Sequence, residues 1–196
     1  RMPFQILWAA VAVWVVALLH WKKPPWDPLM MTAGMYKYVS DLSDFSHEAV
    51  RNYAVSDFEL LYYAEGTTSV VTVARSVGSG NIWLANNGKI DASTTVDLPT
   101  QVLLGHFGQV FVESPDRVLV VGLASGISAG SAAVYTESQL DVLEIEPAVV
   151  TASHFFDHVN NEPLSRPHVR MVVNDARNHI FLAAEPYDIV INQPSN

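Results

Sequence analysis

The chain contains no cysteine, and this absence excludes two kinds of small protein. A disulfide framework and a thiolate zinc site both need cysteine side chains. Basic residues are also scarce, with 11 Lys and Arg against 20 Asp and Glu. An acidic chain repels a phosphate backbone, so we expect no nucleic acid as a partner, while a small cationic molecule is favoured. Solubility alone is an equally good explanation of the acidic charge.

Charged side chains are missing from Met2–Trp21, a run of 20 residues. A helix of about 20 residues, with a rise of about 1.5 Å each, spans the hydrocarbon core of a bilayer. We therefore expect residues 1–23 to form a transmembrane helix, over Phe4–Trp21. A secretory signal peptide is the alternative, but no A-x-A-like cleavage site follows. The pair Lys22–Lys23 directly after the helix would place the rest of the chain in the cytoplasm.

Residues 24–58 and 59–99 differ in pattern. The segment KKPPWDPL contains three prolines and is expected to form a stiff juxtamembrane linker, followed by a short helix that Ser46 caps and that ends near Tyr53. Short runs rich in Val, Leu, Tyr, Thr and Trp then alternate with turn sequences, which predicts a small antiparallel β module with a tight turn at Asn87-Gly88. Its expected strands are Leu60–Tyr63, Ser69–Arg75 and Asn81–Ala85.

Residues 100–196 show alternating strand and helix patterns, which predict an α/β domain with a parallel sheet and right-handed crossovers. The fold class is thus a partial Rossmann-like, methyltransferase-type sheet after a small β module. The expected strands are Val118–Val121, Leu140–Glu144, Val169–Val173 and Tyr187–Ile191. The expected helices are Thr100–Phe111, Ala129–Tyr135, Pro147–Phe156 and Arg177–Ala184.

The segment VLVVGLASGISAGSAAVYTESQLDVLEIE (118–146) has the form of a nucleoside-binding βαβ unit. Gly122, Gly126 and Gly130 are spaced four apart in the turn and helix after an apolar strand. Such glycines let the backbone approach a ligand, and an acid about 20 residues further on can accept hydrogen bonds from ribose hydroxyls. Here that acid is Glu144, at the end of the second strand.

Five motifs together are similar to those of one family. They are GKIDASTTVDLPTQVLLGH, VLVVGLASG, LEIEPAVV, VVNDARN and YDIVINQPSN. In order and spacing they resemble the spermidine synthase (polyamine aminopropyltransferase) family, most closely its membrane-fused bacterial branch, over roughly residues 27–196. The resemblance implies a β domain before a Rossmann-like sheet, a bacterial inner-membrane location, and transfer of an aminopropyl group from decarboxylated S-adenosylmethionine to putrescine or a similar amine. It implies no covalently bound cofactor.

The resemblance also assigns site residues. Gly122 and Gly126 match the glycine-rich turn beneath the nucleoside, with Ser125 between them. Glu144 matches the acid that holds the ribose, and Asp175 the acid near the adenine amino group. A turn residue at the end of a strand is the alternative interpretation of Asp175.

Four positions where the family carries an acid are neutral in this chain, namely Val102, Ser125, Gln193 and Asn196. Aminopropyl transfer needs carboxylates to hold the cationic amine and a base to take a proton from its ammonium group. Neither Gln nor Ser can take up a proton near pH 7. Asp91 and Asp97 are the acids left near the expected entrance, and Asp97 and Gln193 are the candidate catalytic residues.

Three hypotheses about function follow. The chain is an aminopropyltransferase-like enzyme, or a catalytically silent accessory subunit that binds other membrane subunits, or a methyltransferase that uses ordinary S-adenosylmethionine, whose carboxylate Ser125 would not repel. His154 and His158 have zinc-binding spacing but no third ligand nearby, so we expect no metal site there. Because the sequence starts without Met and stops just past the fourth predicted sheet strand, we expect it to be a segment of a longer polypeptide.

Overall fold

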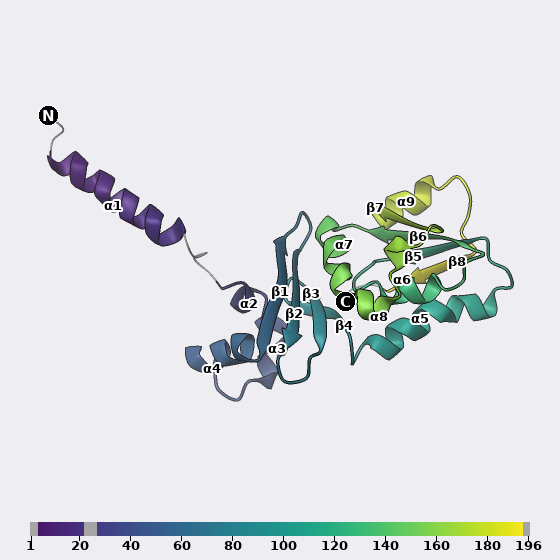
Figure 1. Cartoon of the computed structure of the whole chain (residues 1–196), viewed down its shortest axis with the longest axis horizontal. Coiled ribbons are helices and arrows are strands. Elements are labelled where there is room, and N and C mark those ends of the chain that lie inside the picture. Colours follow the sequence, from purple (N-terminus) through teal and green to yellow (C-terminus); the bar gives the residue numbers. More distant parts are fainter. Residues whose placement is uncertain (1–3, 22–26, 194–196) are drawn as a thin grey trace.

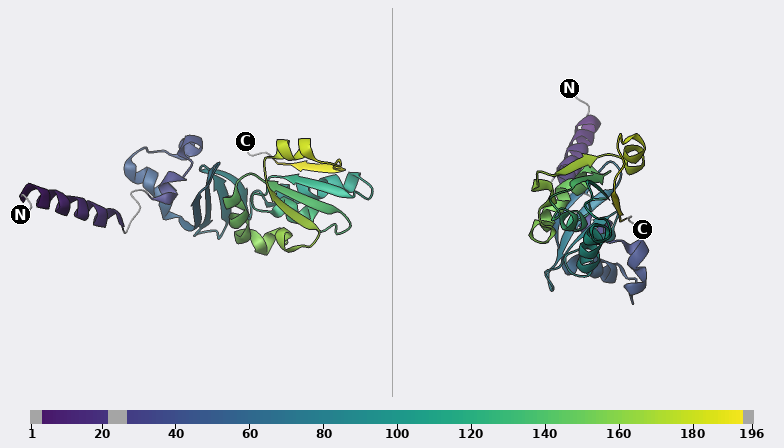
Figure 2. Two further views of the ribbon diagram at one scale, coloured as in Figure 1. Left: turned by 90° about the horizontal axis from the view of Figure 1, so that it is seen from above. Right: turned by 90° about the vertical axis from the view of Figure 1, so that its right-hand side faces the viewer.

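The computed structural model describes residues 4–21 and 27–193. A separate N-terminal helix, a group of short helices and two four-stranded sheets follow one another along the chain (Figure 1). The N-terminal helix α1 (Phe4–Trp21) lies apart from both sheets, as a second view confirms (Figure 2).

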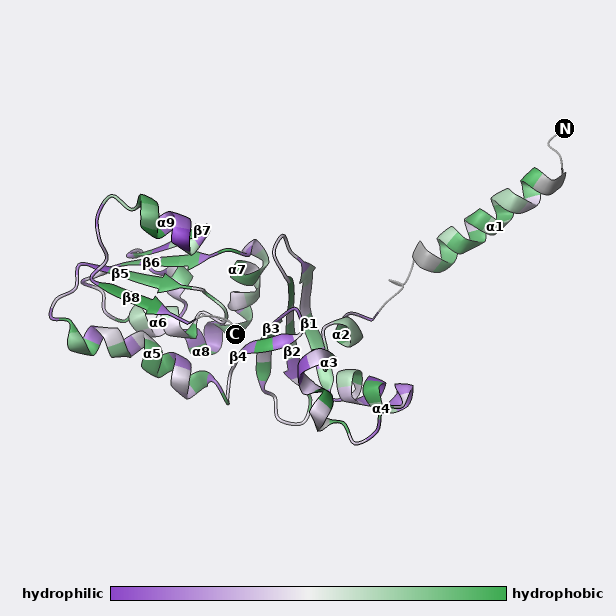
Figure 3. Cartoon of the chain, turned by 180° about the vertical axis from the view of Figure 1, so that it is seen from behind, coloured by the Kyte–Doolittle hydropathy of each residue, from purple (hydrophilic) through white to green (hydrophobic). Residues whose placement is uncertain are grey.

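The predicted transmembrane helix within residues 1–23 is wrong. Helix α1 has 18 residues, fewer than the 20 uncharged residues of the run in the sequence. Although α1 is largely hydrophobic (Figure 3), no helix within residues 4–21 and 27–193 has the length and apolar character that a membrane crossing requires. The prediction of an inner-membrane location is overturned with it. Lys22 and Lys23, from which the orientation was inferred, lie outside the described residues.

Short helices fill residues 27–56. They are α2 (Pro28–Met31), α3 (Met35–Tyr38), the 3₁₀ turn η1 (Val39–Asp41), α4 (His47–Arg51) and the π-helical turn η2 (Asn52–Ser56). Ser46 caps α4 as predicted, because its Oγ accepts a hydrogen bond from the amide of Ala49 at 3.2 Å. Asp27 caps α2, so the segment expected to be a linker is already helical from Pro28.

The predicted β module is an antiparallel sheet with the strand order β1-β2-β3-β4. Its strands are β1 (Phe58–Glu65), β2 (Val70–Ser76), β3 (Ile82–Asn86) and β4 (Lys89–Ser93). The predicted turn joins β3 to β4, with Asn87 at φ 50° and Gly88 at φ 78°. Positive φ at both central residues is the geometry that favours Asn-Gly in a two-residue hairpin.

The predicted parallel sheet is also confirmed, with the order β7-β6-β5-β8 and parallel pairing throughout. Its strands are β5 (Arg117–Val121), β6 (Gln139–Glu144), β7 (Val169–Val173) and β8 (Ile189–Asn192). The helices around it are α5 (Leu98–Phe111), α6 (Ile127–Ala132), α7 (Pro147–Ser153), α8 (Asp157–Asn160) and α9 (Ala176–Leu182), with 3₁₀ turns η3 (His154–Phe156) and η4 (Pro163–Ser165).

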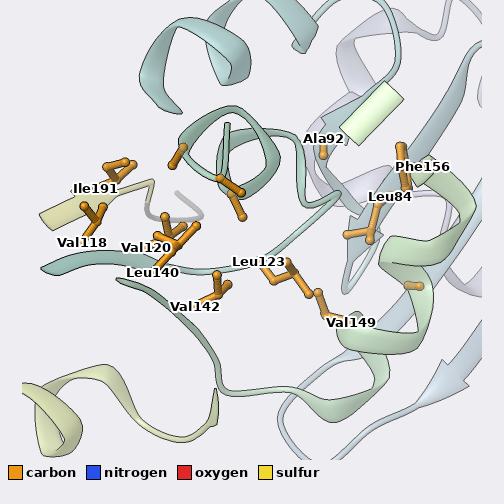
Figure 4. Close-up of a cluster of buried hydrophobic side chains, with 14 of the residues drawn as sticks. Leu84, Ala92, Val118, Val120, Leu123, Leu140, Val142, Val149, Phe156 and Ile191 are labelled. Carbon is orange, nitrogen blue, oxygen red and sulfur yellow. The ribbon is translucent and has the colours of Figure 1, made fainter. Parts of the chain in front are cut away.

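One hydrophobic core joins the two sheets. It contains Leu84 and Ala92 of the antiparallel sheet together with Val118 and Val142 of the parallel sheet (Figure 4). Helix α7 packs against both β2 and β6 and so lies between the sheets. The shared core holds the antiparallel sheet next to the carboxyl ends of the parallel strands.

Candidate functional site

A cleft of about 570 Å³ lies where the two sheets meet. One wall, which we call the floor, contains the carboxyl ends of the parallel strands and the turns that follow them: Val121, Gly122, Ala124, Leu143, Glu144, Ile145, Glu146, Asn174, Asp175, Ala176, Asn192 and Gln193. The opposite wall, the roof, comes from the antiparallel sheet: Thr68, Ser69, Asn86, Lys89 and Asp91. Ligands of open α/β sheets bind outside the carboxyl ends of the strands, so this cleft is the candidate site.

The glycine-rich turn forms part of the floor. Gly122 has φ 88° and Gly126 has φ 78°, a backbone region that L side chains rarely adopt. Gly122 lines the cleft, whereas Gly126 precedes α6. The third glycine of the motif has a different role: a Cβ on Gly130 would lie 1.6 Å from the carbonyl oxygen of Asn160. Gly130 therefore lets α6 pack closely against α8.

Glu144 lies in the cleft beside this turn. Its Oε2 accepts a hydrogen bond from the Leu123 amide at 3.0 Å, and its Oε1 accepts from the amides of Ile145 at 2.9 Å and Glu146 at 3.0 Å. A carboxylate offers about four acceptor positions, so acceptor capacity remains for a ligand hydroxyl. The three amides fix the side chain in one orientation.

Asp175 also lines the cleft, at the end of β7. Its Oδ1 accepts a hydrogen bond from the Asn178 amide at 2.8 Å and caps α9. This contact uses one of the two carboxylate oxygens. The two interpretations of Asp175, a helix cap and a residue that faces a ligand, are therefore compatible. We call Glu144 and Asp175 the acidic side of the cleft.

Neutral groups meet at the positions where the family resemblance predicts acids. Ser125 is buried, and its hydroxyl donates to Oε1 of Gln101 at 3.0 Å. The Ser128 hydroxyl lies 2.9 Å from Oε1 of Gln193 and 3.0 Å from the backbone carbonyl of Gln101. We call Gln101, Ser125, Ser128 and Gln193 the neutral side. Ser125 and Gln193 are the positions of expected acids; Gln193 lines the cleft, and the other three residues are buried.

Gln101 was not identified from the sequence. In the structure its side chain is buried, with 1 % of its surface exposed. It stands one position before Val102, which is half-buried on α5. The one available signal was a polar residue within the apolar stretch of this helix. Asn196, the fourth position with a missing acid, lies outside the described residues.

The two acids expected near the entrance lie in different surroundings. Asp91 is in the roof, where it forms an ion pair with Lys89 at 2.9 Å and accepts from Nδ2 of Asn86 at 2.9 Å. Asp97 lies just before α5 and accepts from the Ser93 hydroxyl at 2.6 Å. Of the two, Asp91 is the one that the structure brings to the cleft.

A further acid of the floor, Glu146, was not identified from the sequence. Burial raises the pKa of this carboxyl group, but hydrogen bonds from Thr68, Ala148 and Ser69 outweigh that effect and lower the pKa to about 2. Glu146 is therefore an ionised, buried carboxylate at neutral pH.

Two other polar clusters lie outside the cleft. Asp141 of β6 accepts a bidentate pair of hydrogen bonds from the Arg170 guanidinium, at 2.8 and 2.7 Å. It also accepts a hydrogen bond from the Tyr187 hydroxyl at 2.6 Å. Burial raises the pKa of Asp141, but these partners lower it overall.

His154 pairs with Asp157 at 3.1 Å. Within residues 4–21 and 27–193 no group of three or more potential metal ligands occurs.

Comparison with known proteins supports one fold family. No family model matches the chain. A polyamine aminopropyltransferase of Vibrio vulnificus (strain CMCP6) is 30% identical over 88 residues, which are 43% of this chain and 28% of that protein. A spermidine synthase in complex with the transition state analogue AdoDATO superposes with a TM-score of 0.64 and 13% identity, over 70% of this chain and 47% of that one.

The spermidine synthase of Thermotoga maritima gives a TM-score of 0.62 at 13% identity, over 68% of this chain and 48% of that one. The chain has a spermidine synthase-like fold. It spans about half the length of these two solved structures. The comparisons do not confirm the narrower resemblance to the membrane-fused branch.

Proposed function

We propose that the cleft binds the adenosine part of a nucleoside of the decarboxylated S-adenosylmethionine type. The observation that carries this proposal is that Gly122, Glu144 and Asp175 line one cleft at the carboxyl ends of β5, β6 and β7. The turn would pass beneath the nucleoside, Glu144 would accept hydrogen bonds from the ribose, and Asp175 would accept one from the adenine amino group. The spermidine synthase-like fold supports the same assignment.

We further propose that this chain does not carry out conventional aminopropyl transfer. In that reaction an amine nitrogen bonds to the propyl carbon, the carbon–sulfur bond breaks, and methylthioadenosine leaves. The nitrogen must first lose a proton to a base. Ser125 and Gln193 cannot serve, and the Asp91 carboxylate of the roof is paired with the Lys89 ammonium. Asp97, the other candidate, accepts from the Ser93 hydroxyl and is not among the residues that line the cleft.

Calorimetry with two nucleosides tests the nucleoside proposal. Decarboxylated S-adenosylmethionine and methylthioadenosine should bind, since both contain the adenosine part that the floor recognises. Incubation of the first with putrescine should yield no aminopropylated amine. Failure of both nucleosides to bind would contradict the proposed site, and product formation would contradict the proposed lack of transfer.

A methyltransferase is the second candidate, favoured by the neutral Ser125. A neutral side does not repel the carboxylate of ordinary S-adenosylmethionine, which an acid at this position would do. Stronger binding of ordinary than of decarboxylated S-adenosylmethionine would select this candidate. Binding of neither would favour a catalytically silent accessory subunit.

A further inference from the structure

Glu146 reaches from the floor of the cleft to the other sheet. It follows β6, and its carboxylate contacts the loop between β1 and β2, about 78 residues earlier in the chain. The Oε2 atom lies 2.7 Å from the amide nitrogen and 2.9 Å from the hydroxyl of Thr68. Longer contacts come from the Thr67 hydroxyl at 3.3 Å and the Ser69 amide at 3.4 Å.

The two oxygens of Glu146 hold different elements. While Oε2 holds the β1–β2 loop, Oε1 accepts from the Ala148 amide at 3.1 Å and caps α7. The residue is only 2 % exposed, and a buried carboxylate is unfavourable unless hydrogen bonds compensate for lost water. These donors provide that compensation, so the contact to the loop belongs to a fixed structure rather than to a flexible surface.

Gly66 allows the loop to come this close. A Cβ at Gly66 would lie 2.3 Å from both Cδ and Oε1 of Glu146. No real Cβ atom approaches a neighbour so closely, so any side chain at this position would push the loop and the carboxylate apart. The lack of a side chain at Gly66 therefore leaves the space that the Glu146 carboxylate occupies.

The same contacts connect the floor of the cleft with its roof. The amide of Glu146 donates to Oε1 of Glu144 at 3.0 Å, so the acid proposed to hold the ribose and the acid that holds the loop share one turn. In the roof, the Ser69 hydroxyl donates to Oδ1 of Asn86 at 3.0 Å. Nδ2 of Asn86 in turn donates to Asp91 at 2.9 Å.

We propose that Glu146 is a positioning residue that holds Thr68 and Ser69 as the roof over a nucleoside bound at Glu144. This inference rests on the proposed function for its ligand, but the contacts that carry it are independent of that function. A solely structural role is the competing explanation, in which Glu146 only joins the two sheets. The two explanations differ in whether ligand affinity depends on Glu146 beyond any loss of stability.

Two variants disturb the contact from opposite sides. Glu146→Gln removes the charge that Thr68 and Ser69 contact, and Gly66→Ala inserts a methyl group between the loop and the carboxylate. Asp188→Asn is a matched control, because the Asp188 carboxylate also accepts two amide hydrogen bonds, from Asp116 and Arg117, at the opposite ends of the strands. Gly78→Ala controls for the added methyl, since a Cβ there would meet nothing within 4 Å.

Calorimetry with methylthioadenosine and hydrogen exchange of the Thr68 and Ser69 amides are the two measurements. Glu146→Gln and Gly66→Ala should each weaken binding about tenfold, which is the effect of losing one hydrogen bond of about 1.4 kcal/mol. Both should also accelerate exchange at Thr68. The two controls should keep wild-type affinity even where their melting temperatures fall, and methylthioadenosine should slow exchange at Thr68 in the wild type.

Unchanged affinity in both variants, together with faster exchange, would overturn the positioning role and leave the structural one. Unchanged exchange at Thr68 would overturn the contact itself. If the wild type bound no nucleoside, the proposed function would fail, and with it the role toward that ligand. Exchange at Thr68 would still report whether Glu146 holds the loop, so the two failures are distinguishable.

Discussion

The acidic side and the neutral side of the cleft are built in different ways. Glu144 and Asp175 accept hydrogen bonds from backbone amides and also line the cleft. Ser125 and Gln101 instead bond to each other in the interior. A carboxylate that is fixed by amides keeps acceptor capacity for a ligand. Two neutral groups that hydrogen-bond to each other use that capacity within the protein. This difference supports the proposal that the cleft binds a nucleoside rather than a cationic amine.

Removal of the acid on the acidic side should have the largest effect. Glu144→Ala should weaken binding of methylthioadenosine about 100-fold, because a carboxylate hydrogen bond contributes about 1.5–3 kcal/mol and three amides lose their acceptor. Calorimetry measures this change. Glu137→Ala, which removes an exposed acid before β6, is the control and should leave affinity unchanged. Equal affinities in the two variants would contradict the role of Glu144.

The support beneath the floor should affect stability rather than recognition. In Gly130→Ala the new methyl group would overlap the carbonyl of Asn160, and overpacking of this kind costs about 1–3 kcal/mol. Urea unfolding should therefore show a free energy of unfolding lower by about 2 kcal/mol, with Gly78→Ala as the neutral control. An unchanged unfolding midpoint would show that α6 and α8 can move apart without lowering the free energy of unfolding.

A carboxylate introduced on the neutral side should give that side an affinity for cations. Gln193→Glu places a carboxylate in the cleft next to the Ser128 hydroxyl, which can donate to it. We expect binding of putrescine to strengthen about tenfold at low salt, because an opposite charge nearby is worth about 1 kcal/mol or more. Gln139→Glu makes the same charge change on an exposed residue at the start of β6. If both variants gained equally, net charge rather than the site would be responsible.

The last expected effect is a pH dependence of the free energy of unfolding. Hydrogen bonds hold the pKa of Glu146 at about 2 in the folded chain, below its usual 4.5, so its contribution is complete above about pH 4.5 and is lost as the pH falls towards 2. Wild type should be more stable than Glu146→Gln at pH 7, because hydrogen bonds to an ionised carboxylate are stronger than those to a neutral amide. The difference should shrink between pH 4.5 and pH 2 in denaturant titrations. A difference that is constant over this range would mean that the pKa of Glu146 is not lowered in the folded chain.

Local elements were predicted well, because they depend on neighbours in the sequence. The apolar run Val118–Val121 and the turn at Asn87-Gly88 predicted β5 and the β3–β4 hairpin at the places where the structure has them. Gly122 and Glu144 were placed on one floor by a known βαβ geometry, and they do line one cleft. The membrane-spanning helix was one local prediction that failed, since none of the described helices combines the length and the apolar character of a membrane span.

The long-range contacts of the cleft could not be predicted in the same way. Gln101 meets Ser125, which lies 24 residues later in the chain, only once α5 has its final position. Nothing in the sequence near Glu146 indicates that its partner is Thr68. Such pairs depend on how two sheets pack, which no local pattern records.

The order of strands and helices, the positions of the turns and the acids at the strand ends were determined by the sequence alone, since hydrophobic periodicity and backbone preferences act over a few residues. The tertiary structure decided what those residues face. Packing of the antiparallel sheet against α7 formed the roof of the cleft and brought Gly66 against Glu146, while packing of α5 against α6 buried Ser125 and Gln101 together. The physical reason is that burial and hydrogen bonding between distant segments exist only after the shared core has formed.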